Sequence, residues 1–521
     1  MTETTIAKGI TFAELLDQDT HPVSEVLRRE SNMAPGNTRV PAAVYHEQAW
    51  HDLEVERLWS RVWQYACMEQ EIAEVGDYHV YDIAHLSFLI VRTAPNEIKA
   101  FRNACLHRGR QLRESHGKGA KNLRCAFHGW CWETDGSLRE IPCEWDFPDV
   151  DTADYSLPEA QVGTWQGFVF INPDLDAEPL ATFLDGIDEH FEQLPFTERY
   201  KAAHVAKIMP VNWKACQEAF MEAYHVVATH PTLMENLGDA NTRYDVYGNF
   251  SRAISPHAVE SPHLYDMPHY ERLEDGKQFA KWRHPMSGHI YEREHEGRVR
   301  VTNLDGHDSW FDEHGNHLEG PQTQADPHLC MWVGGPLLEG MEEIPLMTPN
   351  PPAELESPGE IRSWIADQKR DALRKIHGDD IDLESFADAQ FVDAIFYSVF
   401  PNLSPWGCFN PIFYRFRPNG SDPHSCIMEV MYFPPTPPGE RPAPAEVTHL
   451  GVDDDWTLAT ELGATAKVFQ QDSINLPKVQ IGLRAQKQQE VIFASYNEQK
   501  IRHFYESYFR WLDVDTPVAI S

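Results

Sequence analysis

Two short motifs each pair a cysteine with a histidine, and together they hold four side chains that can bind metal. Cys105 and His107 come first, and Cys125 and His128 follow, with seventeen residues between the motifs. A [2Fe–2S] cluster with two thiolates on one iron and two imidazoles on the other needs this ligand set. Neutral imidazoles raise the reduction potential, so such a cluster is a moderate electron acceptor and donor. The sequence therefore predicts an electron-transfer site.

A zinc site is the alternative at these four residues, because Zn²⁺ accepts the same ligands at similar spacing. Zinc fingers usually place the two cysteines in one pair and the two histidines in the other, whereas each pair here is mixed. Gly109 and Gly129 follow the ligands, where tight turns and backbone N–H donors to sulfur are expected. The mixed pairs favour a cluster of the Rieske type over zinc.

A second group of metal-ligating side chains consists of Glu222, His225 and His230. Glu222 and His225 are three residues apart and would share one face of a helix. His225 and His230 are separated by about 140° around an ideal helix, so they can face one metal only where the helix breaks. Pro231 provides the break, because the residue before a proline avoids the helical region. Two core histidines are the alternative, and a metal would need a further ligand from elsewhere.

Four segments resemble the large subunit of the Rieske non-heme iron oxygenases, and the resemblance covers most of the chain. Two are similar to the entry and exit of that family's Rieske domain, one to its iron-binding helix, and one to the segment with its last iron ligand. In that order they are LWSRVWQYACMEQEIAEVGDYHVYDIAHLSFLIVR, VGTWQGFVFINPD, VNWKACQEAFMEAYHVVATHP and VFQQDSINLPKVQIGLRA. The resemblance implies a Rieske [2Fe–2S] cluster on the two Cys/His motifs and a mononuclear Fe(II) in a second domain.

The resemblance also implies the third iron ligand. The family's pattern places an acidic residue in an (E/Q)-x-D segment late in the chain, and FQQDSIN supplies Asp472. With His225 and His230 it would form a triad of two histidines and one carboxylate, which leaves positions open for O₂ and substrate. The alternative is an aspartate of the run Asp453, Asp454 and Asp455, although that run is more typical of a solvated loop.

Glu222 departs from the family's pattern. Most members have Asp there, and it bridges the mononuclear site to a cluster-ligating histidine of the neighbouring subunit. Glutamate is one methylene longer and can still accept both hydrogen bonds, and some relatives, including oxygenases of quaternary ammonium compounds, use it. We therefore expect Glu222 to carry the electron-transfer bridge and Asn212 to support the site from nearby. An ordinary exposed helix glutamate is the alternative for Glu222.

The composition is that of a globular protein with an acidic surface. The 521 residues are 42% hydrophobic, and 81 acidic against 44 basic residues give a formal net charge of -37. Such a surface repels phosphate backbones and anionic lipid, so neither nucleic acid nor a membrane is an expected partner. Nine cysteines are too few for a disulfide scaffold. The sequence shows neither a signal-peptide pattern nor an apolar run of membrane-spanning length, and we expect a cytoplasmic protein.

The pattern of elements predicts an α+β fold. Residues 1–45 form an N-terminal arm, 46–178 a small all-β Rieske [2Fe–2S] domain, and 179–521 a larger α+β catalytic domain with an antiparallel sheet and helices. Helices are predicted at FLDGIDEHFEQL, NWKACQEAFMEAYHVVATH and AKVFQQDSINLPKVQIGLRA. The His-rich segment 240–350 is predicted to be loops with solvated or hydrogen-bonded histidines rather than a second metal site.

The resemblance implies a terminal oxygenase, a mono- or dioxygenase that hydroxylates a hydrophobic aromatic or alicyclic substrate. The runner-up substrate is a quaternary ammonium or N-methyl compound, which would suit an aromatic cage. The chain has no G-x-G-x-x-G fingerprint, so a separate reductase or ferredoxin would deliver electrons from NAD(P)H. A homotrimer is also implied. A Rieske electron carrier and a zinc-stabilised binding protein are the non-enzyme alternatives, and candidates for an apolar pocket are Phe220, Met221, Val226, Val227 and Phe396.

Overall fold

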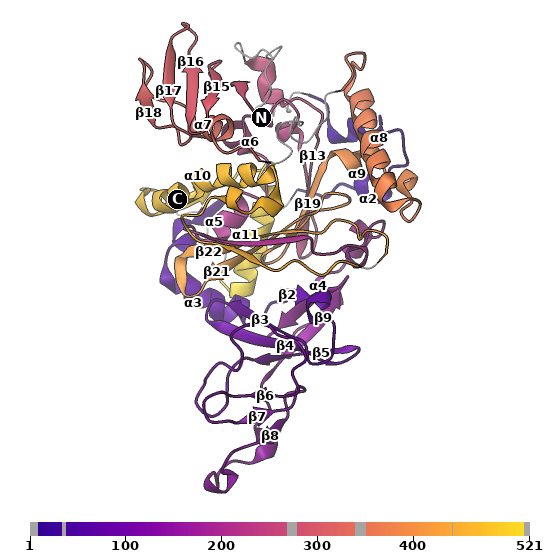
Figure 1. Cartoon of the computed structure of the whole chain (residues 1–521), viewed down its shortest axis with the longest axis vertical. Coiled ribbons are helices and arrows are strands. Elements are labelled where there is room, and N and C mark those ends of the chain that lie inside the picture. The colour runs from indigo at the N-terminus through magenta and orange to yellow at the C-terminus, as the bar shows by residue number, and fades with distance from the viewer. Residues whose placement is uncertain (1–8, 34–37, 268–278, 339–350, 440, 515–521) are drawn as a thin grey trace.

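The computed structural model describes residues 9–33, 38–267, 279–338, 351–439 and 441–514. A narrow lower part is built from strands, and a broader upper part combines sheets and helices (Figure 1). Nearly all neighbouring strands run antiparallel; the parallel pair is β11 with β23. This mixture of helices and antiparallel sheets confirms the predicted α+β class.

The lower part is built on a six-stranded antiparallel sheet, in which two neighbouring strands are buried along their whole length. In sheet order its strands are β2 (Gln64–Met68), β10 (Phe168–Asn172), β9 (Glu159–Trp165), β5 (Glu97–Arg102), β4 (Leu86–Ala94) and β3 (Tyr78–Ile83). A three-stranded sheet lies at the far lower end of the molecule (Figure 1), with β6 (Leu123–Arg124), β7 (Cys131–Trp132) and β8 (Leu138–Glu140). A separate hydrophobic cluster containing Trp130 and Trp132 fills this end and includes both Cys105 and Cys125.

The upper part contains an eight-stranded sheet. In sheet order its strands are β12 (Arg243–Val246), β13 (Phe250–Ser255), β19 (Ala394–Val399), β20 (Leu403–Pro405), β21 (Ile412–Asn419), β22 (Asp422–Tyr432), β11 (Ala203–Met209) and β23 (Thr448–Leu450). Helix α5 (Trp213–Glu218) packs on β21 and β22, and α11 (Gln499–Leu512) packs on β12 and β13. The long helix α10 (Thr465–Ala485) contacts α5, so the sheet, α5 and α10 form successive layers.

Two more helices complete the walls of the upper part. Helix α8 (Pro358–His377) starts with a capping box between Ser357 and Glu360 and has a proline at its first position, both strong start signals. It packs against α9 (Asp388–Val392), which leads directly into β19. Short helices α3 (Gln48–Glu54) and α4 (Leu180–Phe183) and the two-stranded sheet of β1 (Arg39–Pro41) with β24 (Glu490–Ile492) lie around this core.

Arg415, which forms a buried ion pair within the upper sheet, connects the two parts. Arg415 forms two hydrogen bonds with Glu429, at 2.6 and 2.7 Å, and its third nitrogen donates to the carbonyls of Tyr65 and Ala66 on β2. Nearby, Lys201 of the upper part binds Glu71 at 2.6 Å. Because the charges of Arg415 and Glu429 are buried and paired, removing one partner would cost about 3–5 kcal/mol. The two parts are thus held in one relative position.

Two predictions of local structure outside the candidate sites were wrong. The segment FLDGIDEHFEQL is not one helix: Gly186, at φ 83°, separates α4 from a 3₁₀ turn at Asp188–His190. The N-terminal arm contains two short helices, α1 (Phe12–Leu16) and α2 (Glu25–Arg28), and their residues Phe12 and Leu27 belong to the main hydrophobic core. The domain boundaries drawn from the sequence stay predictions.

The second error concerns the His-rich segment, which forms a sheet. In order its strands are β14 (Lys281–Arg283), β15 (Ile290–His295), β16 (Arg298–Thr302), β17 (Asp308–Phe311) and β18 (His317–Glu319), followed by helix α7 (Pro327–Gly334). Short strands with polar outer faces hide their apolar alternation from a reading of composition. His269, another histidine of this segment, lies outside the described residues. The described helices include none whose length and apolar character would suit a bilayer crossing.

Candidate metal centres and cavity

Two loops at the lower end of the molecule, residues 105–110 and 125–130, have the same backbone geometry. In each, the cysteine amide donates to the carbonyl five residues later, at 2.8 Å, and the glycine four residues after the cysteine donates back to the cysteine carbonyl. These glycines, Gly109 and Gly129, have φ values of 74° and 82°, which residues with a Cβ rarely adopt. The repeated turn brings the two Cys/His motifs face to face.

The four candidate cluster ligands differ in how deeply their side chains are buried. Cys105 and Cys125 are 3% and 2% exposed, whereas His107 and His128 are half-buried, with ring centroids 4.6 Å apart. The Nδ1 atom of His107 is buried and has no hydrogen-bond partner within the described chain. A bound metal would satisfy this atom. Thiolates inside and imidazoles outside suit a [2Fe–2S] cluster with its histidine-bound iron toward the surface.

The distances disfavour zinc at these loops. Ligand atoms around a tetrahedral zinc lie about 3.5 Å apart, given bonds of 2.0 to 2.3 Å. Across the described chain, the group of three or more candidate ligands whose atoms all lie within 4.8 Å of one another is His225, His230 and Asp472. The two Cys/His motifs do not form so compact a group. A two-iron cluster, which separates the thiolate pair from the imidazole pair, fits them better.

The predicted iron-binding helix is broken. Helix α5 ends at Glu218, and α6 (Val226–Thr229) is a single turn, so Glu222 and His225 lie between the two rather than on one helical face. The carboxylate of Glu222 accepts hydrogen bonds from the backbone amides of Tyr224 and His225. These bonds close a local turn and compete with the helical ladder. His230 follows the last residue of α6, at the end expected from Pro231.

His225, His230 and Asp472 converge from two elements. The Nε2 atoms of His225 and His230 lie 3.5 and 3.1 Å from Oδ1 of Asp472, which projects from α10. Nδ1 of His225 donates to Oε1 of Glu222 at 2.5 Å, and Nδ1 of His230 donates to Oε1 of Gln471 at 2.8 Å. Each ring is therefore oriented through Nδ1 and presents Nε2, as metal-ligating histidines do. The residues fit a mononuclear iron.

Charge at this site also favours a cation. Burial alone would lower the pKa of His225, but the carboxylates of Glu222 and Asp472 outweigh it and raise the pKa to about 9. Two carboxylates around two imidazoles leave negative charge in a buried place, and a divalent cation would neutralise it.

Other sequence candidates occupy structural positions. The side chain of Asn212 caps α5 by accepting from the amide of Lys214 at 3.1 Å, and it donates to the carbonyl of Pro423. These are the contacts of a helix cap. They do not involve the candidate iron ligands, so they do not support the predicted role of Asn212 at the iron. Asp454 and Asp455 accept backbone amides in turns, away from the convergent group. Gln471 was missed, although it is the variable position of the (E/Q)-x-D pattern.

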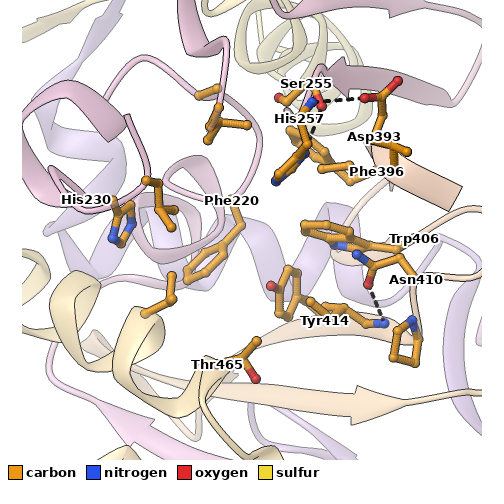
Figure 2. Close-up of a pocket in the computed structure, with 18 of the residues that line it drawn as sticks. Phe220, His230, Ser255, His257, Asp393, Phe396, Trp406, Asn410, Tyr414 and Thr465 are labelled. Carbon is orange, nitrogen blue, oxygen red and sulfur yellow. Dashed lines mark hydrogen bonds between the residues drawn. The ribbon is translucent and has the colours of Figure 1, made fainter. Parts of the chain in front are cut away.

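A cavity of about 640 Å³ opens beside the two imidazoles and Asp472. Aromatic and aliphatic side chains form most of its wall, including the predicted Phe220, Val226 and Phe396 together with Trp406 and Tyr414. Met221 and Val227 pack into hydrophobic clusters instead. Figure 2 shows His230 on one side of the cavity and His257 on the other. The sequence grouped His257 with histidines expected to be solvated or hydrogen-bonded; it is buried, and its Nδ1 is hydrogen-bonded to the carbonyl of Ser255.

Comparison with known families accounts for most of the chain. Residues 62–152 match the Rieske [2Fe-2S] domain, and residues 193–514 match the ring hydroxylating alpha subunit (catalytic domain). The alpha subunit of chlorobenzene dioxygenase from Cupriavidus sp. (strain PS12) is 31% identical over 204 residues, 37% of this chain and 44% of that protein. The carnitine monooxygenase oxygenase subunit of Escherichia coli (strain K12) is 29% identical over 215 residues, 41% and 57% respectively. The chain thus spans about half the length of these curated relatives.

Solved structures share the fold over a greater length. A quaternary ammonium Rieske monooxygenase has a TM-score of 0.53 at 16% identity and covers 92% of this chain and 96% of its own. Naphthalene 1,2-dioxygenase with indole bound in the active site has a TM-score of 0.53 at 18% identity, with 93% of each chain covered. At these identities the likeness concerns the fold.

Proposed function

The chain belongs to the ring-hydroxylating alpha subunits that carry a Rieske [2Fe-2S] domain, and from this premise we propose that it is a terminal oxygenase. One observation carries the proposal: two imidazole Nε2 atoms and a carboxylate oxygen converge beside an apolar cavity. A triad of this kind holds Fe(II) on one face and leaves the other open. The cavity would place an organic substrate against that open face.

Each proposed ligand has a defined task. Cys105, His107, Cys125 and His128 would hold the cluster, and His225, His230 and Asp472 the mononuclear iron. When bound, the cluster supplies single electrons, and the iron supplies the centre at which O₂ is activated. Glu222 and Gln471 hold the two imidazoles in the orientation that presents Nε2. The aromatic wall excludes water from the substrate.

The position of the two sites supports a ring of subunits. The cluster loops lie beside β6 and β7 at one end of the molecule, whereas α5 and α10 lie in the upper part (Figure 1). We propose a homotrimer in which the cluster of one subunit approaches the iron of the next, a head-to-tail contact that closes at three. Glu222, already bonded to His225, would reach His107 or His128 of the partner subunit.

Electrons must come from another protein. A reductase or ferredoxin that draws on NAD(P)H is the proposed donor, and it would dock near the half-buried His107 and His128. All nine cysteines are free, including the buried ones, which suits a reducing cytoplasm.

A hydrophobic aromatic or alicyclic compound is the proposed substrate class, because Trp406, Phe396, Tyr414 and Phe220 dominate the cavity wall. The E. coli carnitine monooxygenase relative and Glu222 keep a quaternary ammonium or N-methyl substrate as the second candidate. An aromatic wall can also bind a cation through its ring faces. The wall by itself is therefore compatible with both substrate classes.

Oxygen labelling tests the proposal. Iron-loaded protein, a surrogate reductase and NADH would be incubated with ¹⁸O₂ and a panel of naphthalene, biphenyl, indole and carnitine. We expect ¹⁸O in an organic product, and no labelled product from the matched Asp472→Ala variant. A cluster that is reduced and reoxidised while no compound gains the label would make the protein an electron carrier. A colourless protein that contains zinc would overturn both interpretations.

A further inference from the structure

His257 is held rigidly in the wall of the cavity. Its backbone amide donates to Oδ1 of Asp393 at 2.9 Å, and its carbonyl accepts from Arg362 at 3.0 Å. Arg362 also binds both carboxylate oxygens of Asp393, at 2.6 and 2.8 Å. All three residues are buried. The Arg362–Asp393 ion pair therefore fixes the backbone of His257, which leaves only its ring to interact with a ligand.

The ring of His257 is held in one tautomer. Its Nδ1 atom lies 3.2 Å from the carbonyl oxygen of Ser255. A carbonyl oxygen can only accept, so Nδ1 carries the hydrogen and Nε2 of the neutral ring is an acceptor. Burial lowers the pKa of His257 to about 4, so the ring is neutral at physiological pH.

Nε2 of His257 faces the cavity. Figure 2 shows the ring extended from the Ser255–Asp393 corner toward the open space, across from His230. The hydrogen bonds of His257 to the described residues use its amide, its carbonyl and Nδ1, which leaves Nε2 free. An acceptor in a mostly apolar wall is costly to leave unpaired once a ligand displaces water.

The charges lining the cavity do not favour a cation near His257. The carboxylates of Glu222 and Asp472 belong to the iron site, and that of Asp393 is neutralised by Arg362. Lys369, which also lines the cavity, adds a basic group on this side. A quaternary ammonium group has no hydrogen to donate to Nε2 and would find no free carboxylate here.

We propose that the substrate carries a hydrogen-bond donor, a hydroxyl or an N–H group, which binds Nε2 of His257 on the side of the cavity opposite His230. This inference rests on the proposed oxygenase function and narrows its substrate class to neutral aromatic or alicyclic compounds with such a donor. The bond orients the ring, so the carbon presented to the iron is the one remote from the donor. His257 is then a specificity-determining residue.

Matched probes test the inference by binding alone. Equilibrium dialysis of the oxidised, iron-loaded protein would compare 2-naphthol with 2-methoxynaphthalene, and indole with 1-methylindole. Within each pair only the donor hydrogen is replaced by a methyl group. We expect the donor probe to bind about 10-fold more tightly, the effect of one neutral hydrogen bond. In His257→Leu the ratio should fall to near one, with the methylated probes bound as in the wild type.

His257→Gln is the conservative control, because its amide oxygen can accept from the same donor and should keep part of the preference. Equal affinities within both pairs in the wild type, an unchanged ratio in His257→Leu, or no binding of any probe would overturn the inference. Dialysis needs neither reductase nor turnover. A flat ratio with ¹⁸O incorporation therefore removes only the role of His257, whereas donor selectivity without incorporation removes the oxygenase proposal.

Discussion

The two candidate metal sites differ in how the chain assembles them. The cluster candidates lie within residues 105–128, on two matching turns beside a small hydrophobic cluster of their own. The iron candidates span residues 225–472 and meet only where Asp472 of α10 lies against His225 and His230, at the two ends of α6. The cluster histidines are half-buried at the end of the molecule, whereas His230 and Asp472 are buried beside a cavity. Separate supports of this kind should let each site be lost without the other.

The largest effect should come from a cluster ligand. Cys125→Ala removes a buried thiolate, so the broad visible absorption of a Rieske protein and all turnover should be lost. Mononuclear iron should remain, because Asp472 and its partners lie in the upper part. Absorption spectra and iron analysis measure both. Cys143→Ser, at an exposed cysteine, is the control and should keep the full spectrum. An unchanged spectrum in Cys125→Ala would move the ligand elsewhere.

The corresponding substitution at the mononuclear iron site is Asp472→Ala. Asp472→Ala should lose the mononuclear iron and turnover while the protein stays red-brown, since it removes the carboxylate that both imidazoles face. Asp453→Ala, in the exposed acidic run, should keep the iron. Metal analysis measures the iron content of both variants, and the visible spectrum shows whether the cluster is kept. Full iron content in the Asp472 variant, or loss of colour with the iron, would end the idea of two independent sites.

Glu222 tests whether the two sites communicate. Glu222→Gln keeps one acceptor but loses the charge that orients the Nδ1–H of His225. Both metals should stay bound, and turnover should fall by about 10-fold to 100-fold, as for other losses behind a metal ligand. Glu222→Asp should retain partial activity. Single-turnover oxidation of the reduced cluster locates the lesion, and a wild-type rate in the Gln variant would reduce Glu222 to a local turn residue.

The smallest expected effect is at Gln471. Gln471→Leu removes the acceptor for Nδ1 of His230 and should weaken iron binding by about 10-fold without changing the cluster spectrum. Gln470→Leu is the matched control, because Gln470 accepts from the amide of Trp456 and does not contact the imidazoles. Competition with a chelator compares the iron affinities. Equal losses in both variants would mean that helix packing, not ring orientation, is measured.

The sequence predicted the features that depend on near neighbours in the chain. The predicted late helix AKVFQQDSINLPKVQIGLRA, which contains Asp472, corresponds to α10. Sequence patterns failed to predict the secondary structure where a side chain, rather than a backbone carbonyl, accepts the backbone hydrogen bonds. The predicted helix through Glu222 is interrupted because the Glu222 carboxylate takes two backbone amides. The His-rich segment was mistaken for loops because its short strands have polar outer faces.

The amino-acid sequence by itself determined the ligand types, the tight turns beside the cluster candidates and the break before Pro231, because each depends on a few adjacent residues. Only the tertiary structure decided that Gln471 orients His230 and that His257 faces a cavity. These facts depend on contacts between residues more than a hundred positions apart, such as His230 with Gln471 and His257 with Asp393, or on the direction in which a side chain points. The spacing of residues along the chain predicts neither these long-range contacts nor the direction of a side chain.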